Sequence, residues 1–247
     1  AQTVGARTPL TGLTIARAYM VSFARGLALD GTGTAAGSSG LTIGRGVNNV
    51  FFSALGSGGT RTIENFSGSG IRFLGGSTGS TLTGIISRRN AVGLSMAAGD
   101  YQGSSIMAST FDSNRSVGVL LDGTRNLVFG GSNSGGSTRG NLISGSLLGF
   151  NASDGLLARG NLVGTRIQGN TVRQHAGNGI VLSNARGVTV GGSTSDVANT
   201  ITINLGSGVV ATGASSGSVV QGNSITGNLR GDIVSRNARG LTVIRRP

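Results

Sequence analysis

The chain has 247 residues and a formal charge of +12, because 20 arginines stand against eight acidic residues. Its 47 glycines with only two prolines exclude collagen, and they exclude helix bundles because each helical glycine costs about 1 kcal/mol relative to alanine. The absence of cysteine excludes disulfide and thiol chemistry, and no apolar run reaches the roughly 18 residues of a transmembrane helix. These features predict a folded protein that is mostly β.

Residues 1–10 are expected to lead into a repeat that fills the rest of a single domain, residues 1–247. The unit is glycine or aspartate, then an apolar residue, any residue and usually a second apolar residue. Its leading residues are Leu27, Ile71, Leu94, Val119, Leu156, Ile180, Val209 and Ile233. Most steps are close to 24 residues, and the first, of 44, is close to two units of 22. Two longer steps contain Gly/Ser-rich segments, 130–140 and 191–195, which we interpret as loop insertions.

Two further sets of apolar residues keep this register. Eight residues before the leading residues stand Tyr19, Ile63, Ile86, Phe111, Leu148, Val172, Ile201 and Ile225. Apolar pairs follow four of the leading residues, as Leu127/Phe129, Val188/Val190, Leu241/Val243 and, after a longer loop, Leu41/Ile43. Units too short to bury their own apolar face predict an all-β solenoid with three short strands per coil. The chain has room for about nine or ten coils.

Polar residues mark the corners between these strands. Five residues before the leading residues stand Ser22, Phe66, Arg89, Asn114, Asn151, His175, Asn204 and Asn228, with Asn90 next to Arg89. Ten residues before the leading residues Ile180, Val209 and Ile233 stand Asn170, Asn199 and Asn223. Asparagine tolerates left-handed backbone angles, and its amide can bond the same amide one coil further on. We expect glycine to supply the other turns, where a positive φ is needed.

These columns resemble the right-handed parallel β-helix of the pectate-lyase-like superfamily, with its asparagine ladder and aliphatic stacks. The segments 129–145 and 190–201 are also similar to the Gly-Gly to Asn-x-Ile pattern of large exported bacterial β-helix repeat proteins. The resemblance implies a right-handed coil and a secreted or cell-surface location. It does not select an activity, because this scaffold carries lyases, hydrolases, epimerases, phage spikes and adhesins. A closed barrel or sandwich is the alternative fold, and it would lack the 24-residue register.

The residue sets that the resemblance associates with catalysis are missing from the chain. Asp112 and Asp154 fall at different offsets in their units, so we expect them at different corners rather than as a catalytic pair. Asp122 and Arg159 share an offset in neighbouring coils, which predicts an ion pair. No metal or cofactor is expected.

Two residues could still act as a general acid or base. The single histidine, His175, replaces asparagine in its column, so we interpret it as a member of the ladder rather than as a general base. A lyase that used Tyr101 as its acid is the remaining alternative.

Arginine placement suggests a binding surface. Arg125, Arg186 and Arg239 share one offset in three alternate units, so their guanidinium groups should lie about 10 Å apart along one edge, twice the strand spacing. Such a row could contact an acidic polysaccharide or a cell-surface polymer. A basic composition also places arginine at any exposed corner, so the row alone does not settle the matter. Aromatic residues are too few to favour specific nucleic-acid binding.

A second surface feature is an aliphatic stripe at the middle position of the repeat strand. In five consecutive units this position, which should face solvent, holds Leu120, Leu157, Val181, Val210 and Val234. Exposed apolar patches usually mark an interface. The stripe could be covered by a second copy of the chain, by a neighbouring domain or by one of the insertions.

The sequence therefore predicts a non-catalytic structural or adhesive β-helix module of an exported or cell-surface protein, with acidic polysaccharide as a possible partner. One alternative is a polysaccharide lyase or epimerase of the same superfamily with an atypical site. The other is a phage or fibre segment that assembles through the aliphatic stripe.

Overall fold

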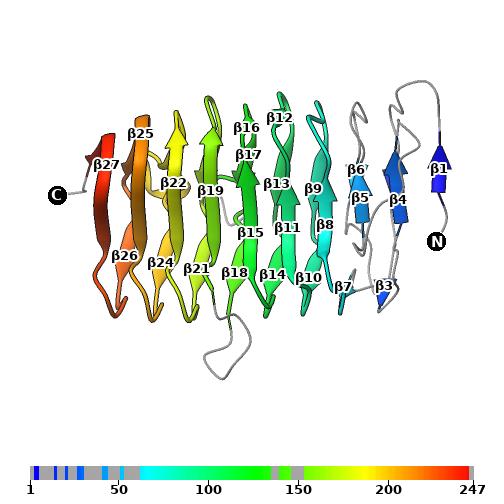
Figure 1. The fold of residues 1–247 in the computed structure, drawn as a ribbon, viewed down its shortest axis with the longest axis horizontal. Coiled ribbons are helices and arrows are strands. Elements are labelled where there is room, and N and C mark those ends of the chain that lie inside the picture. The colour runs from blue at the N-terminus through cyan, green and yellow to red at the C-terminus, as the bar shows by residue number, and fades with distance from the viewer. Residues whose placement is uncertain are drawn as a thin grey trace.

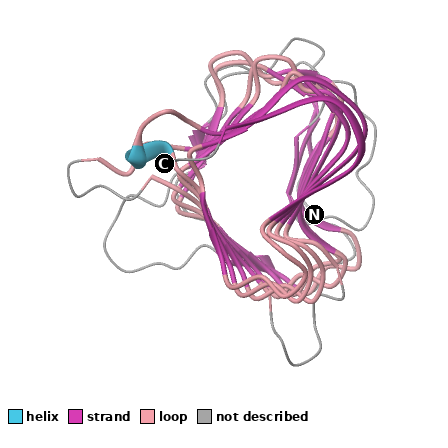
Figure 2. Ribbon diagram, turned by 90° about the vertical axis from the view of Figure 1, so that its left-hand side faces the viewer, coloured by secondary structure: helices cyan, strands magenta, loops and turns pink. Residues whose placement is uncertain are grey.

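The computed structural model describes residues 62–134, 139–145 and 153–244, together with short strands nearer the N-terminus. These early strands are β1 (Thr3–Gly5), β2 (Thr14–Ile15), β3 (Met20–Val21), β4 (Leu27–Asp30), β5 (Leu41–Ile43) and β6 (Phe51–Phe52). Within the described residues every strand pairing is parallel. The chain winds into a rod of stacked coils with N- and C-terminal ends at opposite tips (Figure 1), and the coils superimpose when viewed along the rod (Figure 2).

Three stacks of strands form the walls of this parallel β-helix. The first stack contains β1, β4, β5, β8 (Ser69–Phe73), β11 (Val92–Met96), β15 (Val117–Asp122), β19 (Leu156–Asn161), β22 (Ile180–Arg186), and the starts of β25 (Val209–Gln221) and β27 (Ile233–Ile244). The second contains β2, β6, β9 (Thr81–Thr83), β13 (Ser105–Met107), β17 (Val128–Gly130), β20 (Arg166–Gln168), β23 (Thr189–Gly191) and the ends of β25 and β27.

The third stack completes each coil. It contains β3, β7 (Thr62–Glu64), β10 (Ile86–Arg88), β14 (Thr110–Asp112), β18 (Leu142–Ser144), β21 (Thr171–Arg173), β24 (Thr200–Thr202) and β26 (Ser224–Thr226). The small strands β12 (Gly99–Asp100) and β16 (Thr124–Arg125) pair at the corner between the first two stacks, and η1 (Ser195–Val197) is a single 3-10 turn. The prediction of three short strands per coil is confirmed.

The predicted register of the first stack is confirmed from Ile71 onward. Ile71, Leu94, Val119, Leu156, Ile180, Val209 and Ile233 pair in succession, and all of them except Ile233 are fully buried. The N-terminal part differs from the prediction. Leu41 pairs with both Leu27 and Ile71, so Leu41/Ile43 belongs to the first stack rather than to the second, and the 44-residue step holds two unequal coils. The sheet also extends into the expected lead-in, because β1 pairs with β4.

The third stack corrects three members of its predicted column. Ser87, not Ile86, pairs with Ile63 and Phe111, and Ile143 takes the place assigned to Leu148. Ser87 is tolerated inside because its hydroxyl donates to the carbonyl of Gly93 at 2.8 Å. Met20, not Tyr19, pairs with Ile63. The predicted positions Tyr19, Ser22, Leu148 and Asn151 lie outside the described residues.

Asparagine ladders line both corners of the third stack. At one corner, Asn141, Asn170 and Asn199 each donate from Nδ2 to Oδ1 of the next asparagine, at 2.8 to 3.1 Å, and Asn223 is the last acceptor. At the other corner, Asn204 donates to Asn228 in the same way, at 2.8 Å. The predicted ladder is therefore confirmed. Asn141 was not predicted, because more residues separate it from the following leading residue than in the other units.

The glycine before each repeat strand has a different role from the one expected. Gly93, Gly179 and Gly208 do not have a positive φ. Instead, a Cβ on them would lie 2.6, 3.0 and 2.9 Å from the Nδ2 of Asn114, Asn204 and Asn228. These glycines are required because the ladder side chains occupy the space where a methyl group would be.

Outside the rod, the first predicted insertion meets the residues that directly follow the second, so the second loop extends past its predicted end at residue 195. The backbone N–H of Asn133 donates to the carbonyl of Asp196 at 2.8 Å, and the hydroxyl of Ser132 donates to the Asp196 carboxylate. Gly169, between them, donates to the carbonyl of Val197 at 2.9 Å. Figure 2 shows η1 of the second insertion protruding from the side of the rod. The described parts of both insertions thus lie at the corner of the second and third stacks.

Replacing Gly179 with alanine tests the glycine–ladder contact. The added methyl group would meet the Gly208 carbonyl at 2.7 Å and the Asn204 amide, so we expect a loss of about 2–3 kcal/mol in the free energy of unfolding. Chemical denaturation measures this loss. The control is Gly103→Ala, where φ is +72° and the nearest atoms lie at 3.7 Å, so only the backbone cost of about 1 kcal/mol applies. Equal losses for the two variants would contradict the proposed role of the ladder.

Candidate functional site

The three predicted arginines lie at one corner of the rod, between the first and second stacks. Arg125 ends β16, Arg186 ends β22 and Arg239 lies within β27, and all three side chains are exposed. Between Arg125 and Arg186 comes the turn of β19, and between Arg186 and Arg239 comes the turn inside β25. The structure thus places the arginines on alternate coils. Their proposed role in ligand binding is not tested by this placement.

The turns at this corner alternate in length. Each turn begins and ends with a residue of positive φ, namely Gly123 and Asn126, Gly160 and Gly164, Asn184 and Gly187, Gly213 and Gly217, and Asn237 and Gly240. The two residues are three positions apart in the turns with an arginine and four apart in the turns between them. The strand pairing shifts register at both of the longer turns. The alternation therefore follows from one extra residue in every second coil.

The extra residue sets which side chains stack on the arginines. Val163 and Ser216 precede Gly164 and Gly217 as Arg186 precedes Gly187. The strand pairing places Asn161 opposite Arg186 and Ala214 opposite Arg239. Counting a constant offset from the leading residue would instead put Leu162 in line, and Leu162 is fully buried. The constant offset therefore does not predict Val163 and Ser216 from the sequence. The spacing of the turn glycines and asparagines is the signal that could have found them.

A groove of about 510 Å³ opens around Arg186. It crosses three consecutive turns and is lined by Gly160, Asn161, Val163, Asn184, Arg186, Gly187, Ser216 and Gly217. Asn161 and Asn184 were also not predicted. No acidic residue lines this groove, and Asp122, which lies beside Gly160, is bound to Arg159 at 2.7 Å. That contact confirms the predicted ion pair, and it leaves the positive charge of Arg186 uncompensated by Asp122.

The arginines differ in their electrostatic surroundings. Asp100 pairs with Arg125 along the coil axis. The pKa of Asp100 is lowered, first by a hydrogen bond from Asn126 at 2.9 Å and to a lesser degree by the charge of Arg125. No ion pair joins Arg186 or Arg239 to an acid in the described part of the chain. Arg186 and Arg239 are therefore more available to an anionic ligand than Arg125.

His175 is a ladder residue, as predicted. Its backbone N–H donates to Oδ1 of Asn204 at 3.1 Å, and its Nε2 lies 3.2 Å from the carbonyl of Ile143. Nε2 carries the proton, because a carbonyl can only accept a hydrogen bond. It takes the same place in the ladder as Nδ2 of Asn114, which donates to the carbonyl of Ser87. Burial lowers the pKa of His175 from 6.5 to about 4, opposed in part by the bond to Ile143. The imidazole is thus neutral and shielded from substrate.

Tyr101 is equally unsuited to act as an acid on a substrate. Its side chain is fully buried, and its ring packs edge-on against Phe73 with 5.8 Å between centroids. The hydroxyl lies 2.6 Å from the carbonyl of Gly75 and 2.8 Å from that of Ala97. Burial raises the pKa of Tyr101 well above its usual range. The hydroxyl is a structural donor.

Three acidic residues, Asp112, Asp154 and Glu64, are engaged in structural contacts. Asp154 accepts bonds from the backbone and side chain of Asn178, at 2.7 and 2.8 Å, whereas Asp112 accepts from Ser144 on the third stack at 2.6 Å. Both residues flank the corner between the third and first stacks, and both act on the charge of His175, so the prediction of different corners is not confirmed. Glu64 is bound to Arg88 at 2.7 Å. Among the residues that the structure describes, no group of three or more acidic or histidine side chains could hold a metal ion.

The aliphatic stripe forms one continuous column on the outer face of the first stack. Leu120, Leu157, Val181, Val210 and Val234 pair in succession. Stacking makes each side chain cover its neighbours, so Val210 is only 6% exposed and the others are half-buried. The described parts of the insertions lie at another corner and do not cover it. Its role as an interface stays a prediction.

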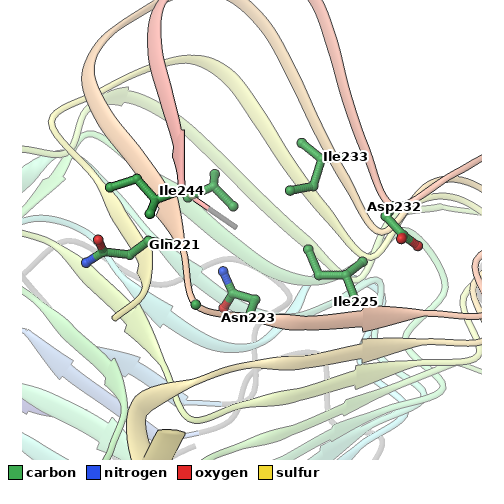
Figure 3. A pocket seen from close by; sticks show the side chains of 8 residues that line it. Gln221, Asn223, Ile225, Asp232, Ile233 and Ile244 are labelled. Atoms are coloured by element: carbon green, nitrogen blue, oxygen red, sulfur yellow. The ribbon is translucent and has the colours of Figure 1, made fainter. Parts of the chain in front are cut away.

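A second, smaller hollow of about 170 Å³ lies at the C-terminal tip (Figure 3). Ile225, Ile233 and Ile244 surround it, with Asn223 from the ladder and Asp232 at its edge. These residues belong to the last described coil, so the hollow is the exposed end of the apolar interior. It offers a single carboxylate and no partner for acid–base chemistry within the described residues.

Comparison with known proteins bears on the fold. No protein-family model matches the chain, and no curated protein matches it in sequence. A solved periplasmic alginate epimerase is similar in structure, with a TM-score of 0.53 and 13% identity over 90% of this chain and 57% of that one.

Two other solved structures are similar at lower TM-scores. The mannuronan C-5 epimerase A-module of Azotobacter vinelandii gives 0.45 at 15% identity, over 90% of this chain and 68% of that one. Tailspike protein 2 of bacteriophage CBA120 gives 0.41 at 12% identity, over 96% and 38%. The chain thus spans little more than half of the periplasmic epimerase. The fold is a right-handed parallel β-helix, as the sequence resemblance implied.

The described helical structure was also compared with the requirements of a membrane-spanning helix. None of its described helical segments has the length and apolar character of a membrane span.

The buried histidine predicts a specific dependence of stability on pH. Above pH 6.5 His175 is neutral in both the folded and the unfolded chain. Below it the unfolded chain takes up a proton that the folded chain refuses until about pH 4. The free energy of unfolding should therefore fall by about 1.4 kcal/mol per pH unit over this window, or about 3 kcal/mol in all.

The matched variant is His175→Asn, which restores the residue type of the ladder. We expect it to fold and to lack this component, so that the wild type loses about 2.5 kcal/mol more than the variant between pH 7.5 and pH 4.5 in urea titrations. Acidic residues titrate equally in both proteins and cancel from the comparison. Parallel pH profiles for the two proteins would show that His175 is not buried in the neutral form.

Proposed function

We propose that this chain is a non-catalytic β-helix module of an exported protein, which holds acidic polysaccharide along its arginine corner. The observation that carries the proposal is the unpaired Arg186, set in a groove without carboxylates and aligned with Arg125 and Arg239. Arginine binds carboxylate and sulfate in a planar, two-pronged geometry. A rigid rod keeps such groups at a fixed spacing of about 10 Å, two strand spacings, so a polymer can contact several of them together.

The chain's charge and its structural neighbour support the same ligand class. A formal charge of +12 attracts acidic polymers over a distance, and it does so without a specific site. The similar periplasmic protein is named an alginate epimerase, and alginate is an acidic polysaccharide. Its name also favours an exported location for this module. The non-catalytic role is supported by the burial of His175 and Tyr101 and by the bonded carboxylates Asp112, Asp122 and Asp154.

Chromatography on immobilised heparin and alginate tests the binding role. Replacing Arg125, Arg186 and Arg239 with alanine should weaken the affinity about tenfold or more, because two exposed and free ion pairs are worth about 1.4 kcal/mol together. The control replaces Arg72, Arg173 and Arg230, which are also exposed but lie on other faces. Both variants lose three charges. Equal retention of the two would assign binding to net charge and remove the corner from the proposal.

Incubation with pectate, alginate or glycosaminoglycans tests the absence of catalysis. We expect no unsaturated product that absorbs in the ultraviolet and no change in the uronate composition of alginate. Either product would identify a polysaccharide lyase or epimerase with an atypical site and would overturn the non-catalytic role.

A further inference from the structure

The groove around Arg186 presents hydrogen-bond donors that nothing in the described chain uses. Oδ1 of Asn184 accepts the backbone N–H of Ala214 at 3.1 Å, and Oδ1 of Asn161 accepts that of Val163 at 3.4 Å. Since a backbone N–H can only donate, these bonds fix the amide orientations and leave both Nδ2 groups free. The Ser216 hydroxyl and the Arg186 guanidinium have no bonded partner among the described residues either.

The remaining lining is apolar or has no side chain. Val163 is 55% exposed and lies against Gly187, the residue after Arg186. Gly160, Gly187 and Gly217 have a positive φ, which explains glycine there, and their lack of side chains keeps the groove open above the backbone. One cation, two amides and one hydroxyl thus surround a small aliphatic surface.

This combination matches the chemistry of an acidic sugar residue. A pyranose ring has an apolar face of C–H groups and a rim of hydroxyl groups, and a uronate or a sulfated sugar adds one anionic group. A nucleic acid would instead require aromatic side chains for base stacking, and none lines the groove. We propose that the groove is a subsite for one acidic sugar residue of a polysaccharide. This proposal rests on the proposed function.

In this subsite each group has a distinct contact. Arg186 binds the carboxylate or sulfate with two parallel N–H bonds, and the Nδ2 groups of Asn161 and Asn184 donate to ring hydroxyls. The Ser216 hydroxyl can donate to the sugar or accept from it. Val163 packs against the C–H face. The sugar is recognised by position as well as by charge.

The alternation of the turns sets how the polymer continues. The next of the shorter turns lies about 10 Å further along the rod. It carries Arg239, and Asn237 takes the place of Asn184 there. In the opposite direction Arg125 has Asp100 at its side. The polymer therefore runs along the rod axis toward the C-terminal tip, and it carries acidic groups about two strand spacings apart.

The variant Asn184→Asp tests the subsite with little change in structure. Aspartate also tolerates the left-handed φ of 49° and keeps an oxygen for the N–H of Ala214, but it replaces a free donor with a negative charge beside Arg186. The matched control is Asn65→Asp, because Asn65 is exposed with φ 65° at a different corner. Thermal melting confirms that both variants fold.

Titration calorimetry with defined tetrasaccharides provides the measurement. The wild type should bind a uronate or heparin tetrasaccharide but not neutral maltotetraose. Asn184→Asp should weaken this binding at least tenfold, while Asn65→Asp should change it less than twofold. Arg186→Lys, which keeps the charge and loses the planar geometry, should also weaken it. Equal binding of maltotetraose, equal effects of the two aspartates or an unaffected Arg186→Lys would each overturn the subsite.

The outcomes separate the subsite from the broader function. If the whole protein is not retained on heparin or alginate, the proposed function fails. If retention falls for the arginine variant while Asn184→Asp behaves like Asn65→Asp, the corner binds the polymer by charge and only the subsite is wrong.

Discussion

Every coil of this protein must be compatible with the coil on either side of it. Parallel pairing places equivalent residues about 4.8 Å apart, so a side chain in a column meets its own kind or a substitute with the same bonding pattern. Asparagine satisfies this condition because its amide donates to one neighbour and accepts from the other, as between Asn170 and Asn199. His175 satisfies it with Nε2 at the Ile143 carbonyl. The glycine column follows from the ladder, because the amides fill the space that a Cβ would need.

Charged residues meet the same condition differently. Two guanidinium groups about 5 Å apart in water repel by roughly 0.8 kcal/mol, and a separation of about 10 Å halves this repulsion before salt screens it further. One charge column solves the problem by pairing Asp122 with Arg159 at 2.7 Å. The arginine corner solves it with turns that carry no arginine on the coils between, where Asn161 lies opposite Arg186 and Ala214 lies opposite Arg239. The spacing that would suit a polymeric anion is thus also the spacing that makes the row stable.

The periodicity of the sequence predicts residues that recur at a constant offset. It does not predict residues displaced by coils or turns of unequal length. The inward residues from Ile71 onward, the asparagine ladder and the Asp122–Arg159 pair could be predicted, because stacking demands them at a constant offset. Leu41 was assigned to the wrong stack, because coils of unequal length share one long step. Ile86 was chosen over Ser87 because hydropathy does not reveal that Gly93 accepts a bond from the serine. Val163 and Ser216 were missed because a one-residue change in turn length shifts the offset.

The location of the candidate site follows from where the repeat can change. A residue inserted into a strand would move every following side chain to the opposite face, which the buried columns do not permit. A residue inserted between two left-handed positions, as between Gly160 and Gly164, is absorbed by the turn and leaves the strands on both sides in register. The corners can therefore vary in length and side chain while the walls stay constant. The groove at Arg186 exists because this freedom is used in alternate coils, and the rigid ladder at the other corners holds its donors in place.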